Sequence, residues 1–257
     1  MAAEKSSENS NDKSKGAGDS KNAGALDKGA FFSDLLSSLK KNKVLVAIII
    51  ALTIFGGLLE DVLTGDIMRL DTYAYQLFVV TLRSDALTPL MEGFSSLGSP
   101  IVVIVMAAIL AAFAPGRRPG YCVAINVVCA LALNQLLKNL IQRPRPDGFR
   151  LVAETGYSFP SGHSMISMAF FGLIVWMIWH YEHDRVQRYG WSIFFSIIIL
   201  CIGVSRIYLG VHYASDVLAG FCVSFLWLVF YTRVVVPPLM RMPEPIKAQD
   251  SPRFNDR

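Results

Sequence analysis

The chain has 257 residues, of which 53% are hydrophobic and 17% are charged, and its formal net charge is +4 at pH 7. This apolar content exceeds that of an ordinary soluble domain and indicates a protein of the lipid bilayer. The basic residues fall into tails, short loops and one motif, without the basic face of a nucleic-acid-binding domain, so we expect no nucleic-acid partner.

Residues 1–43 form a polar segment rich in Ser, Asn, Gly, Asp and Lys. Such a segment cannot bury enough apolar surface to fold alone, so we expect a disordered tail on the cytoplasmic side. A cleaved signal peptide would place a short basic region and an apolar stretch near Met1, and neither is seen there. The first apolar stretch is therefore expected to stay in the membrane as an anchor.

The rest of the chain is dominated by apolar stretches of about 20 residues, which is long enough to cross the hydrocarbon as a helix. They lie near residues 44–63, 92–114, 119–140, 162–181, 190–209 and 215–236. Helices are expected because unpaired backbone groups are costly in lipid. The sequence predicts an all-α fold, a polytopic membrane protein with a six-transmembrane-helix bundle over residues 44–236 and a short cytoplasmic tail over residues 237–257.

Basic residues beside the spans predict the orientation in the membrane. They are Lys40, Lys41, Lys43, Arg117, Arg118, Arg185, Arg188, Arg233 and Arg241. By the positive-inside rule these sides are cytoplasmic, which leaves residues 64–91, 141–161 and 210–214 on the outer face. We expect a multi-pass protein of the cell membrane, in the inner membrane of a bacterium, with its active site on the outer face.

The first outer segment has apolar residues at helical spacing: Leu70, Tyr73, Ala74, Leu77 and Phe78. This pattern predicts a short amphipathic helix along the interface. Two interpretations stay open: the helix lines a path for lipid entry, or it only covers the bundle.

The four cysteines, Cys122, Cys129, Cys201 and Cys222, lie inside apolar stretches. There they are expected to be small buried hydrophobes, so we predict neither a disulfide nor a metal site.

Three polar clusters stand at span ends, where ionisable groups are costly and point to function. The first runs from Lys138 through Arg143 and Arg145 to Pro146. The second is the Pro-Ser-Gly-His sequence of residues 160–163, and the third runs from Ser205 through Arg206 and His212 to Asp216. The expected topology places all three clusters on the outer face. Arg143, Arg145 and Arg150 break the positive-inside rule there, so an anionic ligand is expected to explain them.

This inventory suits phosphoryl transfer. Lys138, Arg145 and Arg206 can neutralise phosphate oxygens, since guanidinium offers paired donors that match phosphate. Ser161 and the Gly162 amide, at a helix start, can add donors to the same oxyanion. On a helix, His212 and Asp216 would share one face, so that the carboxylate can fix the tautomer of the histidine.

The motifs Lys-x6-Arg-Pro, Pro-Ser-Gly-His and Ser-Arg-x5-His-x3-Asp, in this order, resemble those of the type 2 phosphatidic acid phosphatase family over roughly residues 44–236. The resemblance implies that His212 attacks phosphorus, Asp216 orients His212, and His163 protonates the departing oxygen. A phosphohistidine intermediate is then hydrolysed. Lys138, Arg145, Ser161, Gly162 and Arg206 would hold the phosphate, without metal or another cofactor. Arg143 also precedes a proline, but only Arg145 lies at the spacing of the motif.

The expected function is hydrolysis of a membrane lipid phosphate or diphosphate, such as phosphatidic acid, phosphatidylglycerol phosphate or undecaprenyl diphosphate. Two alternatives stay open: a lipid-linked phosphotransferase with the same site, and a non-enzymatic transporter or scaffold that binds phosphate lipids. The family's site also resembles that of vanadium haloperoxidases, but those are soluble, which the six spans disfavour. The expected partners are the lipid substrate and the bilayer, and the sequence indicates no oligomeric state.

Overall fold

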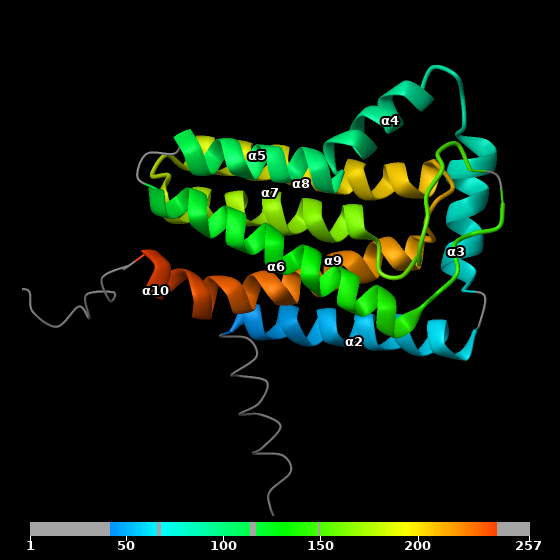
Figure 1. Cartoon of the computed structure of the whole chain (residues 1–257), viewed down its shortest axis with the longest axis horizontal. Coiled ribbons are helices and arrows are strands. Elements are labelled where there is room, and N and C mark those ends of the chain that lie inside the picture. The colour runs from blue at the N-terminus through cyan, green and yellow to red at the C-terminus, as the bar shows by residue number, and fades with distance from the viewer. Residues whose placement is uncertain (1–41, 66–67, 114–116, 149, 241–257) are drawn as a thin grey trace, which may run out of the picture. The chain divides into compact units, whose positions relative to one another are not determined.

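The computed structural model describes residues 42–65, 68–113, 117–148 and 150–240 (Figure 1). Within these ranges every regular element is helical, so the predicted all-α fold is confirmed. The predicted tails lie almost wholly outside the described residues: the first described helix begins at Lys43, and the last ends at Met240. A compact unit begins at Ile48.

Five stretches of helix are long and apolar enough to cross a membrane among the described residues. They are α2 (Lys43–Thr64), α6 (Arg117–Ile141), α7 (Gly162–Tyr181), α8 (Arg185–Tyr208) and α9 (Ala214–Phe230), the last continuing through η2 (Tyr231–Val235) into α10 (Val236–Met240). Each coincides within a few residues with a predicted span. A multi-pass membrane protein is therefore the architecture that the helices support.

The predicted span over residues 92–114 is two helices rather than one, α4 (Thr88–Leu97) and α5 (Pro100–Phe113), bent by 52°. Proline lacks the amide hydrogen that would continue the helix and disfavours helical geometry at the preceding residue, Ser99. A Cβ at Gly98 would collide with Ile202 of α8, so glycine lets the bend approach that helix closely. Counted as one span, the bent pair brings the number to six.

Helix α7 lies at the centre of the compact unit and packs against α5, α6, α8 and α9 (Figure 1). Its four neighbours each contribute a buried side chain to one apolar cluster around Phe170 of α7: Val103, Val127, Ile202 and Leu228. A helix surrounded in this way is apolar on all sides. Helix α7 begins at Gly162, which places the Ser-Gly-His turn at one end of the bundle.

The outer surface of α8 is apolar as well. Ile193, Ile197 and Leu200 recur along one face of the helix and are 58%, 53% and 57% exposed. Large apolar side chains in such a stripe would be unfavourable in water, whereas lipid tails accept them. This surface is therefore suited to the hydrocarbon of the bilayer.

The helix predicted in the first outer segment is present as α3 (Arg69–Ala74), which continues into the π-helix η1 (Tyr75–Thr81). Ala74 and Phe78 pack against Ile207 and Val217 of α8 and α9. Leu70 and Tyr73, in contrast, are 43% and 69% exposed. Only part of the predicted apolar stripe therefore packs on the bundle.

Candidate active site

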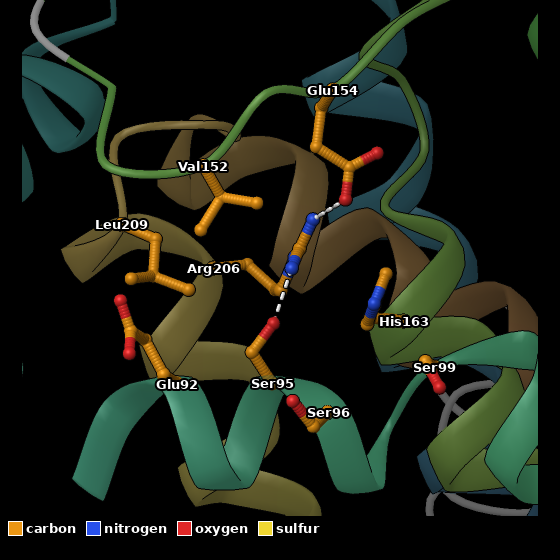
Figure 2. A pocket seen from close by; sticks show the side chains of 9 residues that line it. All are labelled: Glu92, Ser95, Ser96, Ser99, Val152, Glu154, His163, Arg206 and Leu209. Atoms are coloured by element: carbon orange, nitrogen blue, oxygen red, sulfur yellow. Dashed lines mark hydrogen bonds and ion pairs between the residues drawn. The ribbon is translucent and has the colours of Figure 1, made fainter. Parts of the chain in front are cut away.

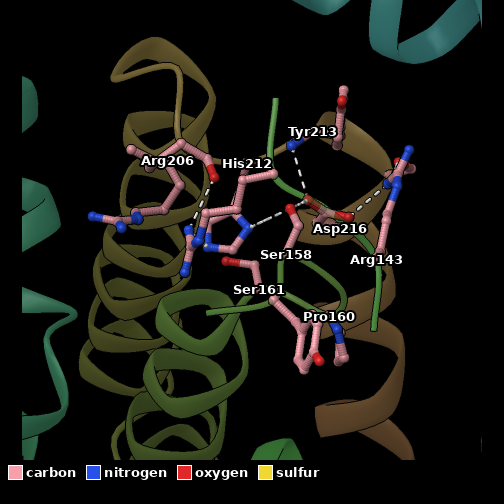
Figure 3. A network of polar contacts seen from close by, with 12 residues as sticks. Arg143, Ser158, Pro160, Ser161, Arg206, His212, Tyr213 and Asp216 are labelled. Carbon is pink, nitrogen blue, oxygen red and sulfur yellow. Dashed lines mark hydrogen bonds and ion pairs between the residues drawn. The ribbon is translucent and has the colours of Figure 1, made fainter. Parts of the chain in front are cut away.

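The three sequence clusters meet at one end of the bundle (Figure 3). Lys138 lies in the last turn of α6, His163 in the first turn of α7, and Arg206 in the last turn of α8. His212 lies in the turn between α8 and α9, and Asp216 in the first turn of α9. The loop between α6 and α7 supplies Arg145 and, outside the predicted set, Arg143, Glu154 and Ser158.

The imidazole of His212 is buried between a carboxylate and a guanidinium. Its Nδ1 lies 3.3 Å from Asp216 Oδ2 and 3.3 Å from Ser158 Oγ. On the other side of the ring, Nε2 lies 3.3 Å from Arg145 Nη1. Because guanidinium only donates, this arrangement favours the tautomer with hydrogen on Nδ1 and the lone pair on Nε2.

Burial lowers the pKa of His212 to about 4, against the hydrogen bond and charge of Asp216, which raise it. The charges of Arg206 and Arg145 lower this pKa further. The imidazole is therefore neutral near pH 7, with an unprotonated Nε2. A neutral nitrogen that is held in one tautomer can act as a nucleophile.

Asp216 is fully buried and accepts hydrogen bonds on both oxygens. Its Oδ2 accepts the Tyr213 amide at 2.9 Å and the Ser158 hydroxyl, and its Oδ1 accepts Arg143 Nη1 at 2.6 Å. The carboxylate at the third position of α9 thereby accepts from the backbone amide of the N-cap residue, which is one of the two hydrogen bonds of a capping box. A buried carboxylate with these donors stays charged and has one fixed orientation.

The two predicted phosphate-binding arginines share one carboxylate. Arg206 donates to Ser95 and to Glu154 Oε1, and Arg145 Nη2 lies 3.6 Å from Glu154 Oε2. Arg145 also donates to the carbonyl oxygens of Thr155, Gly156 and Val211 at 3.0–3.1 Å. Burial raises the pKa of Glu154, but Arg206 and Arg145 outweigh it, so this pKa is lowered and the carboxylate stays charged.

One N–H donor of the Arg206 side chain has no acceptor among the described residues. The residue is 1% exposed, and its Nε has no hydrogen-bond partner in the described part of the chain. A buried, unpaired donor on a cation is unfavourable unless a ligand accepts from it. An anion bound at this position would supply the acceptor.

The start of α7 places the Ser-Gly-His turn beside α9. The Ser161 amide donates to the Asp216 carbonyl at 3.0 Å, and the Ser161 hydroxyl accepts from Ser164 Oγ at 3.0 Å. A Cβ at Gly162 would lie 3.0 Å from Asn134 Oδ1, so the backbone approaches α6 closely there. Lys138 Nζ donates to the Tyr157 carbonyl at 2.9 Å.

A pocket of about 340 Å³ opens beside His163 and Arg206 (Figure 2). Its wall is formed by Glu92, Ser95, Ser96, Ser99, Val152, Glu154, His163, Arg206 and Leu209. Three serines from α4 and the α4–α5 bend give this wall hydroxyl groups, which the sequence did not point to. In the described part of the chain, no three His, Cys, Asp or Glu side chains are grouped to hold a metal ion.

Arg143 was weighed in the sequence only as a competitor of Arg145. In the structure it contacts Asp216 and Asp71, whereas Arg145 contacts His212. Asp71 was missed, because an acidic residue in a surface helix carries no signal of its partners. The doubled Arg-Pro sequence was the available sign that two different arginines have two different tasks.

A family model described as the PAP2 superfamily matches residues 118–238. Phosphatidylglycerophosphatase B of Bacillus subtilis is 33% identical over 153 residues, which cover 57% of this chain and 74% of the relative. The chain belongs to the PAP2 superfamily. The resemblance that the three motifs indicated is thereby confirmed.

Other relatives of this PAP2 protein are also named as phosphatases. Undecaprenyl-diphosphatase of Sulfolobus acidocaldarius is 28% identical, with 63% of this chain and 78% of the relative covered. Dolichyldiphosphatase 1 of Homo sapiens is 32% identical, with 56% of this chain and 66% of the relative covered. The predicted class of enzyme, a phosphoric ester hydrolase, is thus confirmed at the level of the family.

Solved structures agree with this assignment. A transmembrane PAP2-type phosphatidylglycerolphosphate phosphatase from Bacillus subtilis matches with a TM-score of 0.64 and 28% identity, covering 72% of this chain and 94% of that one. LpxE of Aquifex aeolicus matches with a TM-score of 0.54 and 21% identity, covering 65% of this chain and 96% of that one. The latter likeness concerns the fold alone.

Proposed function

We propose that this PAP2 protein hydrolyses a membrane lipid phosphate through a phosphohistidine formed on His212. The observation that carries the proposal is the setting of His212: Nδ1 faces the buried carboxylate of Asp216, and Nε2 faces Arg145 at 3.3 Å. A neutral Nε2 beside a cation is placed to attack a phosphorus atom whose oxygens that cation holds.

In the first step, the Nε2 lone pair forms the N–P bond while the bond from phosphorus to the lipid oxygen breaks. His163 in its protonated form donates a proton to the departing oxygen, so that the lipid leaves as an alcohol and His163 becomes neutral. In the second step, water attacks the phosphoryl group, and His163 takes a proton from it. The N–P bond breaks, inorganic phosphate is released, and His212 returns to its neutral form.

The cations compensate the charge of the phosphoryl group. Lys138, Arg145 and Arg206 lie on three segments that meet at this end of the bundle, and the free Nε of Arg206 supplies a donor without rearrangement. Ser161 and the Gly162 amide add uncharged donors at the start of α7. Because these groups supply the charge that a metal ion would otherwise provide, we propose a reaction that needs no metal.

The pocket beside His163 favours a particular leaving group. In-line attack by His212 places the departing oxygen on the opposite side of phosphorus, next to the proposed acid His163. Among the described residues, the pocket wall there carries two carboxylates, Glu92 and Glu154, and the cation Arg206. A departing oxygen that belongs to an uncharged glycerol unit with a free hydroxyl fits this wall better than one that belongs to a second phosphate. We therefore favour a phosphomonoester such as phosphatidylglycerol phosphate over a polyprenyl diphosphate.

The proposed site of action follows the predicted orientation. The loops that carry the motifs are those that the charge distribution places on the outer face. Placement in the inner membrane of a bacterium remains a prediction from the sequence.

The test is release of inorganic phosphate by purified protein in detergent, with a strong chelator present. The panel contains phosphatidylglycerol phosphate, phosphatidic acid and undecaprenyl diphosphate, and His212→Asn is the matched control. We expect release from the monoesters by the wild type and none by the variant. Transfer of phosphate only to an added acceptor would favour the phosphotransferase, and binding without release would favour a transporter or scaffold.

A further inference from the structure

Asp216 shares the guanidinium of Arg143 with a second carboxylate, Asp71. Arg143 Nη1 lies 2.6 Å from Asp216 Oδ1, and Nη2 lies 3.0 Å from Asp71 Oδ2. The side chains of Asp71 and Asp216 are 4% and 0% exposed, and that of Arg143 is 12% exposed. Solvent therefore screens these two ion pairs little.

Asp71 is held as firmly as Asp216. Ser215 donates to both oxygens of Asp71, from its amide at 2.8 Å and from its hydroxyl at 2.7 Å. The Ser215 hydroxyl in turn accepts Arg143 Nη1 at 2.7 Å, and the guanidinium carbon lies 4.0 Å above the Tyr213 ring. The interface helix α3 is thereby tied to the first turn of α9, where Asp216 lies.

The order of charges explains why two carboxylates are needed. A fully buried carboxylate such as Asp216 needs a counter-charge, and Arg143 provides it. Arg143 alone would cancel the negative charge that Asp216 presents to His212. Together with Asp71 the three groups carry a net charge of about −1, as expected for two carboxylates and one guanidinium. Burial lowers the pKa of Arg143, but the two carboxylates raise it more, so Arg143 stays charged.

We propose that Arg143 and Asp71 are positioning residues for the attack by His212. Arg143 holds Asp216 Oδ1, so that Oδ2 is turned toward His212 Nδ1. Asp71 offsets the charge of Arg143, so that a net negative charge faces the imidazole as it becomes positive on taking up the phosphoryl group. This inference rests on the proposed function, and it extends the reaction to a helix that contributes none of the three sequence motifs.

The inference predicts in which direction the pH dependence of the reaction shifts when Asp71 is replaced. The charged or titratable groups that face His212 are Asp216 from α9, Arg206 from α8, His163 from α7, and Arg145 and Glu154 from the α6–α7 loop. None of these is changed when Asp71 is replaced. Loss of the Asp71 charge leaves Asp216 as the carboxylate that alone compensates Arg143. Less negative charge then faces the imidazole, which disfavours protonation of His212. The acid limb of kcat, where His212 becomes neutral as the pH rises, then moves to lower pH.

The experiment compares Asp71→Asn with Asp85→Asn, which removes an exposed carboxylate from the same outer segment. Both are assayed for phosphate release from a short-chain phosphatidylglycerol phosphate in detergent across pH. For Asp71→Asn we expect kcat to fall by roughly 10- to 100-fold, KM to stay within about twofold, and the acid limb to move to lower pH. The Asp85→Asn protein should match the wild type.

If the Asp71→Asn protein does not insert into the membrane, two further variants still test the inference. Asp71→Glu keeps the negative charge and should retain most of kcat. Arg143→Lys keeps the positive charge but loses the planar guanidinium that contacts both carboxylates, so kcat should fall with little change in KM. The inference is overturned if kcat of Arg143→Lys is unchanged, or if Asp71→Asn alters only KM or stability while its acid limb stays in place. A wild type that releases no phosphate from any lipid contradicts the proposed function instead.

Discussion

Glu154 and Arg206 form an ion pair at the wall of the pocket beside His163 (Figure 2). The same carboxylate lies 3.6 Å from Arg145 Nη2. A carboxylate therefore occupies donors that the proposed reaction needs for phosphate. Substrate must displace Glu154 or share the two arginines with it.

We expect Glu154→Gln to bind phosphate-like anions more tightly, because two buried cations lose their internal partner. The inhibition constant of orthovanadate should fall by roughly 3- to 10-fold, as for the loss of a partly screened charge. Asp147→Asn, which changes an exposed carboxylate of the same loop, is the control. Weaker vanadate inhibition of Glu154→Gln would show that Glu154 positions the arginines rather than competing with the ligand.

Glu92 provides a test of the preferred leaving group. Its replacement by Gln removes one negative charge from the pocket wall, which matters most for a leaving group that is itself a phosphate. We expect the ratio of kcat/KM for undecaprenyl diphosphate to that for phosphatidylglycerol phosphate to rise by roughly 3- to 10-fold. If the wild type prefers the diphosphate and Glu92→Gln leaves the ratio unchanged, the preference for a departing oxygen on an uncharged glycerol unit is wrong.

The two histidines should respond differently to the leaving group. His212→Ala should be almost inactive on both an alkyl phosphate lipid and an aryl phosphate with an acidic phenol, because no phosphoenzyme forms. His163→Ala should lose roughly 10²- to 10⁴-fold on the alkyl ester and recover much of this on the aryl ester, which departs unprotonated. Selective loss in His212→Ala and equal loss in His163→Ala would reverse the two roles.

The orientation in the membrane can be tested by cysteine labelling in intact cells. Asp147 is exposed on the loop that carries Arg145, and His183 is exposed in the turn between α7 and α8. The four native cysteines lie in α6, α8 and α9. An impermeant thiol reagent should modify Asp147→Cys without lysis and His183→Cys only after lysis. The opposite pattern would place the active site on the cytoplasmic side.

The sequence was informative where a physical constraint is local. A helix in lipid must satisfy its own backbone, so long apolar stretches predict spans, and α7 begins and ends at the residues expected. The four-residue spacing likewise predicted that His212 and Asp216 would meet, although His212 lies in the turn before α9 and only Asp216 is on the helix. The bend at Ser99 and Pro100 was missed because hydropathy averaged over the stretch does not distinguish a straight helix from a bent one; the sequence Gly98-Ser99-Pro100 was the available sign.

Contacts between segments that are distant in the chain could not be predicted from the sequence. Asp71 meets Ser215 across 144 positions of the chain, and Arg206 meets Ser95 across 111. Neither Asp71 nor Ser95 belongs to a motif, and each owes its role to the helix that carries it. Glu154 likewise belongs to no motif, and only the structure shows that its side chain is 25% exposed and paired with Arg206.

The proposed chemistry can be observed on the intermediate itself. Wild-type protein is mixed with a lipid carrying a labelled phosphoryl group, quenched within milliseconds in alkali, which preserves phosphohistidine, and digested for mass spectrometry. We expect the label on His212, its absence in His212→Asn, and formation and decay at rates that match turnover. Full turnover with the label on Ser161, or with no labelled protein at any quench time, would contradict attack by His212.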